Sequence, residues 1–156
     1  MPSVKPIPDG FNSLTPHLVC AGAADAIGFY AKAFNAVEQM RLPGPDGKLV
    51  HASVSIGNSM LMLMDENPAW GVQGPAALKG TPVTIHLYVA DVDAAVAQAA
   101  AAGATVVMPP ADMFWGDRYA VLKDPFGHSW SLATHTRDLS HAEIIQGMQS
   151  MPVNCG

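Results

Sequence analysis

The chain has 156 residues, of which 49% are hydrophobic, and this is enough apolar material for one globular domain with its own core. Its eight lysine and arginine residues and its net charge of −5 exclude the concentrated basic surface that nucleic-acid-binding proteins use. No stretch approaches the roughly 20 apolar residues of a membrane span, and no signal peptide is recognisable. The protein is therefore expected in the cytoplasm, with neither a nucleic acid nor a membrane as its partner.

A short alternating segment opens the first half of the chain. In the sequence SLTPHLVC, residues 13–20, Thr15 and His17 fall on one face, whereas Leu18 and Cys20 fall on the other. This alternation predicts a β-strand with one polar and one apolar face.

A helix and three more strands are predicted after this strand. Residues 24–34 repeat apolar side chains at helical spacing, and Asn35 follows at a position where a residue in a left-handed conformation usually ends a helix. The turn signals PGPDG and GN then separate further strand patterns. These strands are predicted at residues 36–42, 47–57 and 59–65.

The second half of the chain repeats this order. VTIHLYVA, residues 83–90, predicts a strand with Thr84, His86 and Tyr88 on one face. An alanine-rich helix follows and ends at Gly103. Three further strands are predicted at residues 104–110, 117–124 and 128–135.

The spacing between the two halves indicates an internal duplication. Thr15 and Thr84 are as far apart in the sequence as His17 and His86. We therefore predict an α+β fold of two paired βαβββ modules, whose strands form a curved eight-stranded cup with the helices outside. The expected boundaries are residues 12–66 for the first module, 67–81 for a linker, 82–135 for the second module and 136–156 for a C-terminal helical tail.

Several segments, in the same order, resemble the vicinal oxygen chelate superfamily, which contains glyoxalases, extradiol dioxygenases and bleomycin resistance proteins. TPHLVC, AIGFYAKAFNA, HASVSIGNSMLMLMDE and WGDRYAVLKDPFGHSWSLATH are most similar to its PhnB-like branch. The resemblance covers about residues 12–138. It implies a glyoxalase-like fold of paired βαβββ modules, in agreement with the duplication.

The resemblance also implies where a metal ion is usually held, on the first and fourth strands of each module. Those positions fall on Thr15, Leu61, Thr84 and Ser131 in this chain. Leucine has no metal-binding group, and neutral hydroxyls are weak ligands beside carboxylates and imidazoles. The usual metal site is therefore expected to be absent, and no cofactor is expected.

Two histidines leave an alternative open. His17 and His86 each lie two residues beyond the usual ligand position, on the same strand face and about 6 to 7 Å further along. They could hold a divalent metal (Zn, Fe, Mn or Ni) as a displaced pair, with His51 or a residue of a partner chain as the third ligand. The other interpretation is that they form hydrogen bonds in the cavity or bind a polar group of a ligand.

The polar and aromatic segment FWGDRYAVLKDPFGHSW supplies further candidates. Trp115 would stack on a planar ligand, and Arg118 would hold an anionic group. The alternative is that Asp117 and Arg118 form a turn that only fixes the entry of the strand. His128 is expected to face the solvent near a turn, and His135 to belong to a connector before the last helix.

The orientation of the fourth strand decides what lines the cup. The resemblance places Leu61 inward, and this turns Met60, Met62 and Met64 outward as core residues. Leu61 and Tyr88 then make the pocket less polar than that of a metalloenzyme, so an apolar ligand is expected.

Three functions are compatible with these features. The first is a metal-independent protein that binds a small molecule in the cup, similar to the resistance proteins that sequester a compound in a dimer cleft. The second is a metal-dependent lyase, isomerase or dioxygenase that uses His17 and His86. The third is a scaffold that acts only by dimerising. We favour the binding protein and expect a homodimer, and the modules can pair within one chain or across two because both arrangements bury the same faces.

Overall fold

The protein folds into two βαβββ units that are joined by a segment with two short helices. The structure, a computed structural model, describes residues 3–152. Its strands are β1 (His17–Cys20), β2 (Val37–Pro43), β3 (Leu49–Ile56), β4 (Ser59–Asp65), β5 (Thr84–Tyr88), β6 (Thr105–Asp112), β7 (Asp117–Lys123) and β8 (Ser129–His135). Its helices are α1 (Ala23–Phe34), η1 (Pro68–Trp70), α2 (Pro75–Leu78), α3 (Val92–Ala102) and α4 (His141–Gln149).

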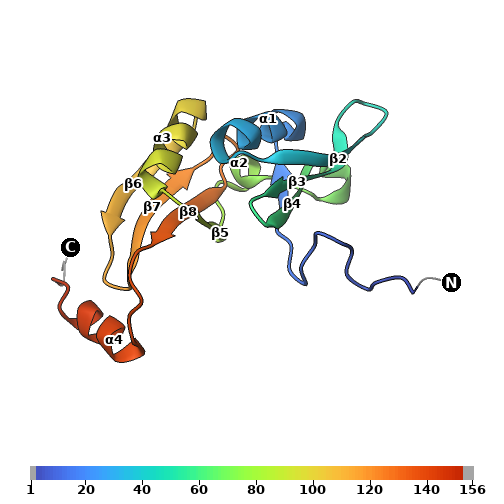
Figure 1. Ribbon diagram of the computed structural model, residues 1–156. Helices are drawn as coiled ribbons and strands as arrows, with labels where there is room; N and C mark the ends of the chain where they lie inside the picture. The colour runs from blue at the N-terminus through green and yellow to red at the C-terminus, as the bar shows by residue number, and fades with distance from the viewer. Residues whose placement is uncertain (1–2, 153–156) are drawn as a thin grey trace.

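Each unit forms a four-stranded sheet. The strand orders are β1-β4-β3-β2 and β5-β8-β7-β6, so β1 and β5 are edge strands that run parallel to β4 and β8. The helices α1 and α3 lie side by side above the two sheets (Figure 1). This arrangement confirms the predicted α+β fold of two paired βαβββ modules, and the open sheets are consistent with a cup.

The local sequence explains where the helices begin and end. Asn35 ends α1 with a left-handed φ of 56°, as predicted. Asp91 begins α3 and Ser140 begins α4, because their side chains accept hydrogen bonds from the backbone N–H groups of Ala94 and Glu143. These caps satisfy donors that the first turn of a helix leaves unpaired.

The duplication extends to the hydrogen bonds that anchor each long helix to its sheet. The carboxylate of Asp65, at the end of β4, accepts hydrogen bonds from the N–H groups of Gly22 and Ala23 at 3.0 and 2.9 Å. At the corresponding place on β8, the hydroxyl of Thr134 accepts one from the N–H group of Val92 at 2.9 Å. Each unit therefore uses its last strand to satisfy the start of its own helix.

One hydrophobic core is shared by both units. Phe34 on α1 packs against Trp130 on β8 with ring centroids 4.6 Å apart. Tyr30 and Trp130 each donate a hydrogen bond to the buried carboxylate of Asp124, at 2.6 and 3.0 Å. The helix of the first unit is therefore anchored directly on the sheet of the second, and the two units form a single body.

The first strand is shorter than the sequence predicts. It begins at His17, directly after Pro16, whose ring nitrogen has no hydrogen to donate to a strand ladder. Leu14, which the same alternation would place on the apolar face with Leu18 and Cys20, is 88% exposed. Thr15 lies in the segment that precedes the strand.

The predicted orientation of β4 is wrong. Leu61 and Leu63 are 3% and 0% exposed and belong to the core beneath the helices. Met60, Met62 and Met64 alternate with them and therefore lie on the opposite face of the sheet. Both sets are apolar, so hydropathy does not distinguish them, and the packing of α1 against the sheet decides which set is buried.

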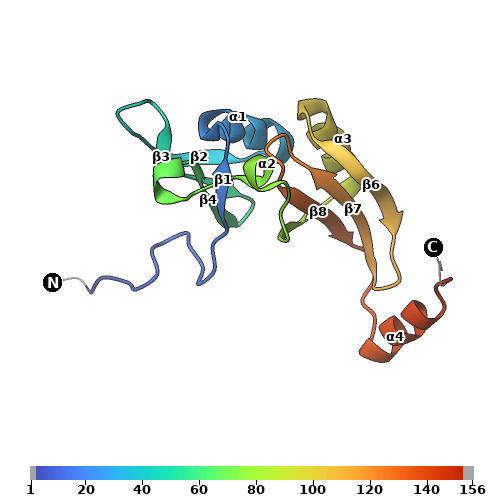
Figure 2. The same cartoon turned by 180° about the vertical axis from the view of Figure 1, so that it is seen from behind.

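The C-terminal helix α4 lies below β6, β7 and β8, apart from the two long helices (Figure 2). None of its residues is buried. The predicted tail runs to residue 156, but residues 153–156 lie outside the part of the chain that the structure describes. Among residues 3–152, no helix is long and apolar enough to cross a membrane.

Candidate functional site

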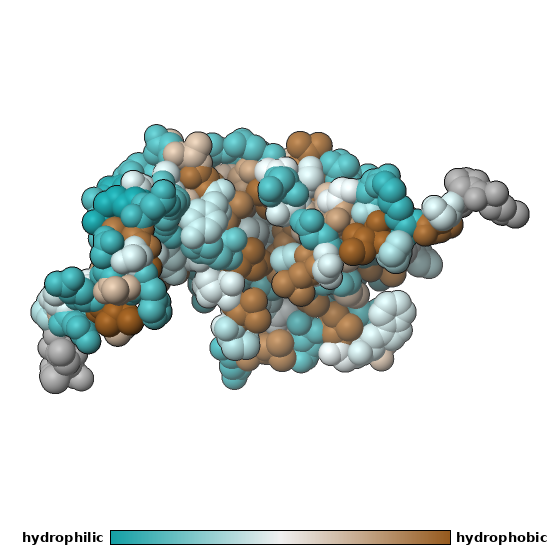
Figure 3. Space-filling view, turned by 60° about the horizontal axis from the view of Figure 1, so that its bottom comes forward, coloured by the Kyte–Doolittle hydropathy of each residue, from teal (hydrophilic) through white to brown (hydrophobic). Residues whose placement is uncertain are grey.

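Each sheet has one side that packs on the helices and one that faces away from them, and we call the latter sides the first and second open faces. Because side chains alternate along a strand, the register assigns residues to each face. The first open face carries His17, Val19, Met40, Leu42, His51, Ser53, Ser55, Met60, Met62 and Met64. The second carries Thr84, His86, Tyr88, Asp117, Tyr119, Val121, Ser129, Ser131, Ala133 and His135. From below, hydrophobic residues gather over the middle of the molecule (Figure 3).

A row of aromatic side chains crosses the second open face. The ring of His86 meets Tyr88 edge-on at 4.6 Å and stacks with Tyr119 at 6.0 Å, measured between centroids. Trp115 continues the row with an edge contact to Tyr119 at 5.3 Å. The Nδ1 atom of His86 lies 2.6 Å from the hydroxyl of Ser131, which leaves Nε2 of the imidazole directed away from that bond.

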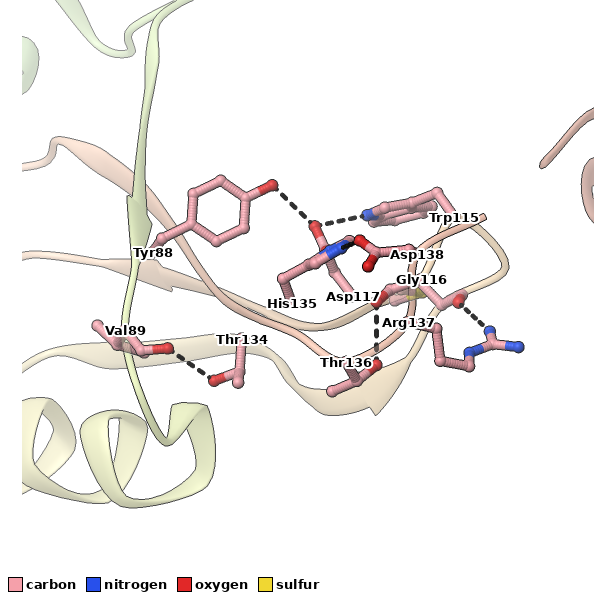
Figure 4. Close-up of polar contacts among 11 residues, drawn as sticks. Tyr88, Val89, Trp115, Gly116, Asp117, Thr134, His135, Thr136, Arg137 and Asp138 are labelled. Carbon is pink, nitrogen blue, oxygen red and sulfur yellow. Dashed lines mark hydrogen bonds and ion pairs between the residues drawn. The ribbon is translucent and has the colours of Figure 1, made fainter. Parts of the chain in front are cut away.

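A buried carboxylate holds one end of this row in place. Asp117 is only 4% exposed, and its two oxygens accept hydrogen bonds from Tyr88 at 3.0 Å, Trp115 at 3.1 Å and Nδ1 of His135 at 2.7 Å (Figure 4). The other nitrogen of His135 lies 2.8 Å from the carboxylate of Asp138. Three donors from separate segments therefore converge on one acceptor and fix the orientations of two aromatic rings.

These contacts shift the acid–base behaviour of the cluster. Burial alone would raise the pKa of Asp117, but the hydrogen bonds from His135, Tyr88 and Trp115 together lower that pKa below its usual value. The pKa of His135 is raised, first by its hydrogen bond to Asp117 and then by Asp138. The pKa of Tyr88 is also raised by its hydrogen bond to Asp117. Asp117 is therefore an ionised anchor at neutral pH.

The first open face has a different character. The rings of His17 and His51 meet edge-on with centroids 5.5 Å apart. Partial burial lowers the pKa of His17, and the neighbouring His51 lowers it further. Met62 lies directly opposite His17 in the strand pairing. This face therefore combines two imidazoles with thioethers, and among the described residues it carries no row of aromatic rings like that of the second open face.

The side chains that the structure describes do not fit the expected alternative metal site. Within residues 3–152, no group of three or more His, Cys, Asp or Glu side chains is arranged to hold a metal ion. His17 neighbours His51, whereas His86 neighbours Tyr88 and Tyr119. Because Zn and similar ions take at least three protein ligands in catalytic sites, a pair of His17 and His86 does not fit a divalent metal here.

Several cavities lie where the units meet, and one of about 430 Å³ is lined by Phe34, Ile56 and Tyr88. Thr15, Leu61 and His86 line a second cavity of about 150 Å³, so three of the predicted ligand-binding residues come together. A third cavity of about 380 Å³ is lined by His17, His128 and residues of the linker. The volumes of the first and third cavities fall within the roughly 300–1,000 Å³ of small-molecule sites, whereas that of the second does not.

Two other predicted site residues, Thr84 and Arg118, form polar contacts that locate their side chains. Thr84 donates a hydrogen bond to the hydroxyl of Ser129 at 3.2 Å on the second open face. Arg118 lies elsewhere, because alternation turns it away from that face and its guanidinium pairs with Asp93 at 2.7 Å and Asp112 at 3.3 Å. Through these pairs Arg118 links α3 to the sheet. Asp117 and Arg118 also begin β7, directly after a turn in which the carbonyl oxygen of Asp117 accepts a hydrogen bond from the N–H group of Met113 at 2.8 Å, as the alternative of a turn at the entry of the strand predicted.

Sequence reasoning missed the partners that organise the site. His135 was placed both at the end of the strand predicted over residues 128–135 and in the connector after it; it is the last residue of β8, and its contact with Asp117 was not predicted. His128 was expected to face the solvent, yet its Nε2 lies 2.8 Å from the carbonyl oxygen of Val19 in β1. One feature of the sequence could have placed His135 at the site. Residues 129–135 alternate along a strand, and this alternation puts His135 on the same face as Ser131.

Comparison with known proteins agrees with this architecture. The model of the Glyoxalase/Bleomycin resistance protein/Dioxygenase superfamily matches residues 10–132. The uncharacterized protein Mb0911c of Mycobacterium bovis is 52% identical over 141 residues, which cover 88% of this chain and 93% of that protein.

Two solved structures have a similar fold. TioX from Micromonospora sp. ML1 has a TM-score of 0.63 and 25% identity, covering 80% of this chain and 98% of its own. TnmS3, an antibiotic binding protein from Streptomyces sp. CB03234, has a TM-score of 0.60 and 22% identity, covering 78% and 93%. The second likeness concerns the fold alone. By its family match over residues 10–132, the chain belongs to the glyoxalase/bleomycin resistance protein/dioxygenase superfamily.

Proposed function

We propose that this protein binds a small planar molecule on its second open face and acts as a binding protein of its superfamily. The observation that carries this proposal is the row formed by Tyr88, His86, Tyr119 and Trp115. Tyr88 is 60% exposed although it is held by a hydrogen bond. His86 is also exposed, and Tyr119 and Trp115 are half-buried. Aromatic rings in contact with one another offer an apolar surface on which a flat ligand stacks.

The row is prepared for binding before a ligand arrives. Asp117 holds the phenol of Tyr88 and the indole of Trp115 by hydrogen bonds, so little side-chain entropy is lost when a ligand stacks on them. The free edge of the His86 ring supplies a polar contact beside the apolar surface, because Ser131 occupies its Nδ1 atom. An aromatic ligand with one polar substituent fits this combination best.

We also propose that the protein is a cytoplasmic homodimer in which a second copy covers the open faces. Met40, Leu42 and Tyr88 are 45%, 50% and 60% exposed on those faces, and burying them would complete a cup around the ligand. The proposal includes membership of the PhnB-like branch, which rests on the sequence motifs, and binding without a divalent metal. The antibiotic binding protein of the same fold is compatible with this function, but this chain's own residues carry the argument.

The test is the binding of naphthalene- and quinoline-based fragments, observed by saturation-transfer and ¹H–¹⁵N NMR. We expect Tyr88→Ala and Trp115→Leu each to weaken the bound fragments about tenfold, because each loses one stacking surface. Trp70→Leu is the matched control, since Trp70 is 65% exposed but lies in the linker away from the second open face. Fragments whose binding depends on Trp70 and not on Tyr88 or Trp115 would contradict the proposal.

A further inference from the structure

Thioether side chains are concentrated on the first open face. On β4, every side chain that lies on the first open face is a methionine. These residues, Met60, Met62 and Met64, are half-buried. The register places Met62 opposite His17 on β1 and Met64 opposite Val19. Three sulfur atoms therefore lie along the strand that separates the two histidine-bearing strands β1 and β3.

The imidazoles of His17 and His51 converge over that strand. They are carried by β1 and β3, which flank β4 and so have backbones roughly 10 Å apart. Their ring centroids are nevertheless only 5.5 Å apart. The two rings therefore approach each other across β4, on the face that carries Met60, Met62 and Met64.

These two histidines differ from the others on the strands and turns. His86, His128 and His135 each have a hydrogen-bond partner for a ring nitrogen, whereas His17 and His51 form no side-chain hydrogen bond with residues 3–152. In its neutral form, each of these rings has one nitrogen with a free lone pair. The two rings meet edge-on at 5.5 Å, and imidazole is the commonest metal ligand in proteins.

The geometry points to a site for the soft monovalent cation Cu(I), formed by His17, His51, Met62 and Met64. Thioether sulfur and neutral imidazole nitrogen are ligands that Cu(I) accepts, whereas Mg, Ca and Mn select oxygen. The site lies within one sheet and is separate from the aromatic row of the proposed function. Cys20 does not contribute, because it is fully buried on the helix side of β1 and burial raises the pKa of its thiol to about 12.

The experiment is an anaerobic titration of the full chain with Cu(I) in ascorbate, with bicinchoninate as the competing chromophore. A Cys155→Ser background removes the thiol that lies outside the described residues. Ag(I), a redox-inert analogue, is used to follow the imidazole ¹H–¹⁵N signals, and Zn(II) is titrated for comparison. We expect one Cu(I) per chain, with Ag(I) shifting the signals of His17 and His51 and not those of His86.

The variants separate sulfur from nitrogen ligation. Met62→Leu with Met64→Leu keeps the volume and apolarity of the face, so the fold is retained. It should weaken Cu(I) binding by more than the roughly tenfold that loss of an outer partner costs. His17→Ala should do the same. Met108→Leu with His141→Ala changes one methionine and one histidine outside the site and should bind Cu(I) as the unchanged chain does.

Three results would overturn the inference. The first is a failure of the chain to take Cu(I) from bicinchoninate. The second is Cu(I) binding that the methionine variant leaves unchanged, and the third is Zn(II) binding of equal strength, since either would describe an imidazole site without sulfur. Fragment binding measured on the same variants distinguishes this inference from the proposed function, because loss of Met62 and Met64 should leave the aromatic row intact.

Discussion

The two open faces place a histidine at corresponding strand positions and surround it with different side chains. On the first face, His17 is paired in register with Met62, whereas on the second face His86 is paired with Ser131. Serine offers a hydroxyl, and the Nδ1 atom of His86 lies 2.6 Å from it. Methionine offers only a weakly accepting thioether, so His17 has no such anchor.

The strands β3 and β7 extend this difference between the two open faces. The neighbour of His17 is His51, with centroids 5.5 Å apart, and the corresponding neighbour of His86 is Tyr119, at 6.0 Å. A second imidazole lowers the pKa of His17, whereas a phenol extends an aromatic row. One duplicated backbone therefore supports a soft, sulfur-rich face and a hydrogen-bonded aromatic face.

The sides of the sheets that face the helices have diverged much less. Leu18 pairs with Leu63 in the first sheet, and Leu87 pairs with Leu132 in the second. Both pairs contribute to or pack against the one shared core, where a change of volume is costly. The comparison teaches that packing constrains one side of each sheet and leaves the other free to acquire separate chemistry.

The largest expected effect tests this division on a single strand. Leu63→Ala should lower the free energy of unfolding by about 2–5 kcal/mol, because it leaves a cavity in a fully buried site. Met62→Leu on the neighbouring position should cost less than about 1.5 kcal/mol. Urea unfolding followed by circular dichroism measures both, and equal costs would show that β4 is not oriented as described.

A smaller effect is expected from the anchor of the second face. Asp117→Ala should cost about 1–3 kcal/mol, because the donors of Tyr88, Trp115 and His135 lose their common acceptor. Because the pKa of Asp117 is lowered by folding, its contribution is present at neutral pH and fades as the pH falls through that lowered value, below the ordinary 3.8.

Urea unfolding at pH 7 and in acid checks this prediction. Asp112→Ala is the control, since Asp112 is a largely exposed partner of Arg118 and its loss should change stability by no more than about 0.5 kcal/mol. Asp117→Ala and Asp112→Ala of equal stability would contradict the role of Asp117 as an anchor.

The smallest effects are shifts in protonation, and they have opposite signs on the two faces. NMR titration should find the pKa of His17 below 6.5 and that of His135 above it. His51→Ala should raise the pKa of His17, and Asp117→Asn should lower that of His135. A raised pKa stabilises the folded state at low pH, so the contribution of His135 is lost as the pH rises through its folded pKa. If the pKa values of His17 and His135 were shifted in the same direction, the predicted contrast between the two faces would be wrong.

Sequence reasoning recovered part of the site. The alternation of residues 83–90 correctly placed His86 and Tyr88 together, and Trp115 joins them through Tyr119. Sequence reasoning failed where neighbouring residues alone could not distinguish two orientations of a strand or identify the partner of a side chain. Leucine and methionine alternate in β4 with similar hydropathy, and Arg118 has carboxylates near it in space that are far away in the chain.

By itself, the sequence determined the two βαβββ units and the ends of their helices. Periodicity, the left-handed Asn35 and the glycine at position 103 are local properties that a short segment expresses wherever it lies. Only the tertiary structure decided which side of β4 is buried and which donors meet at Asp117. Those outcomes depend on the packing of α1 against a sheet and on strand register, which join residues that are distant in the chain.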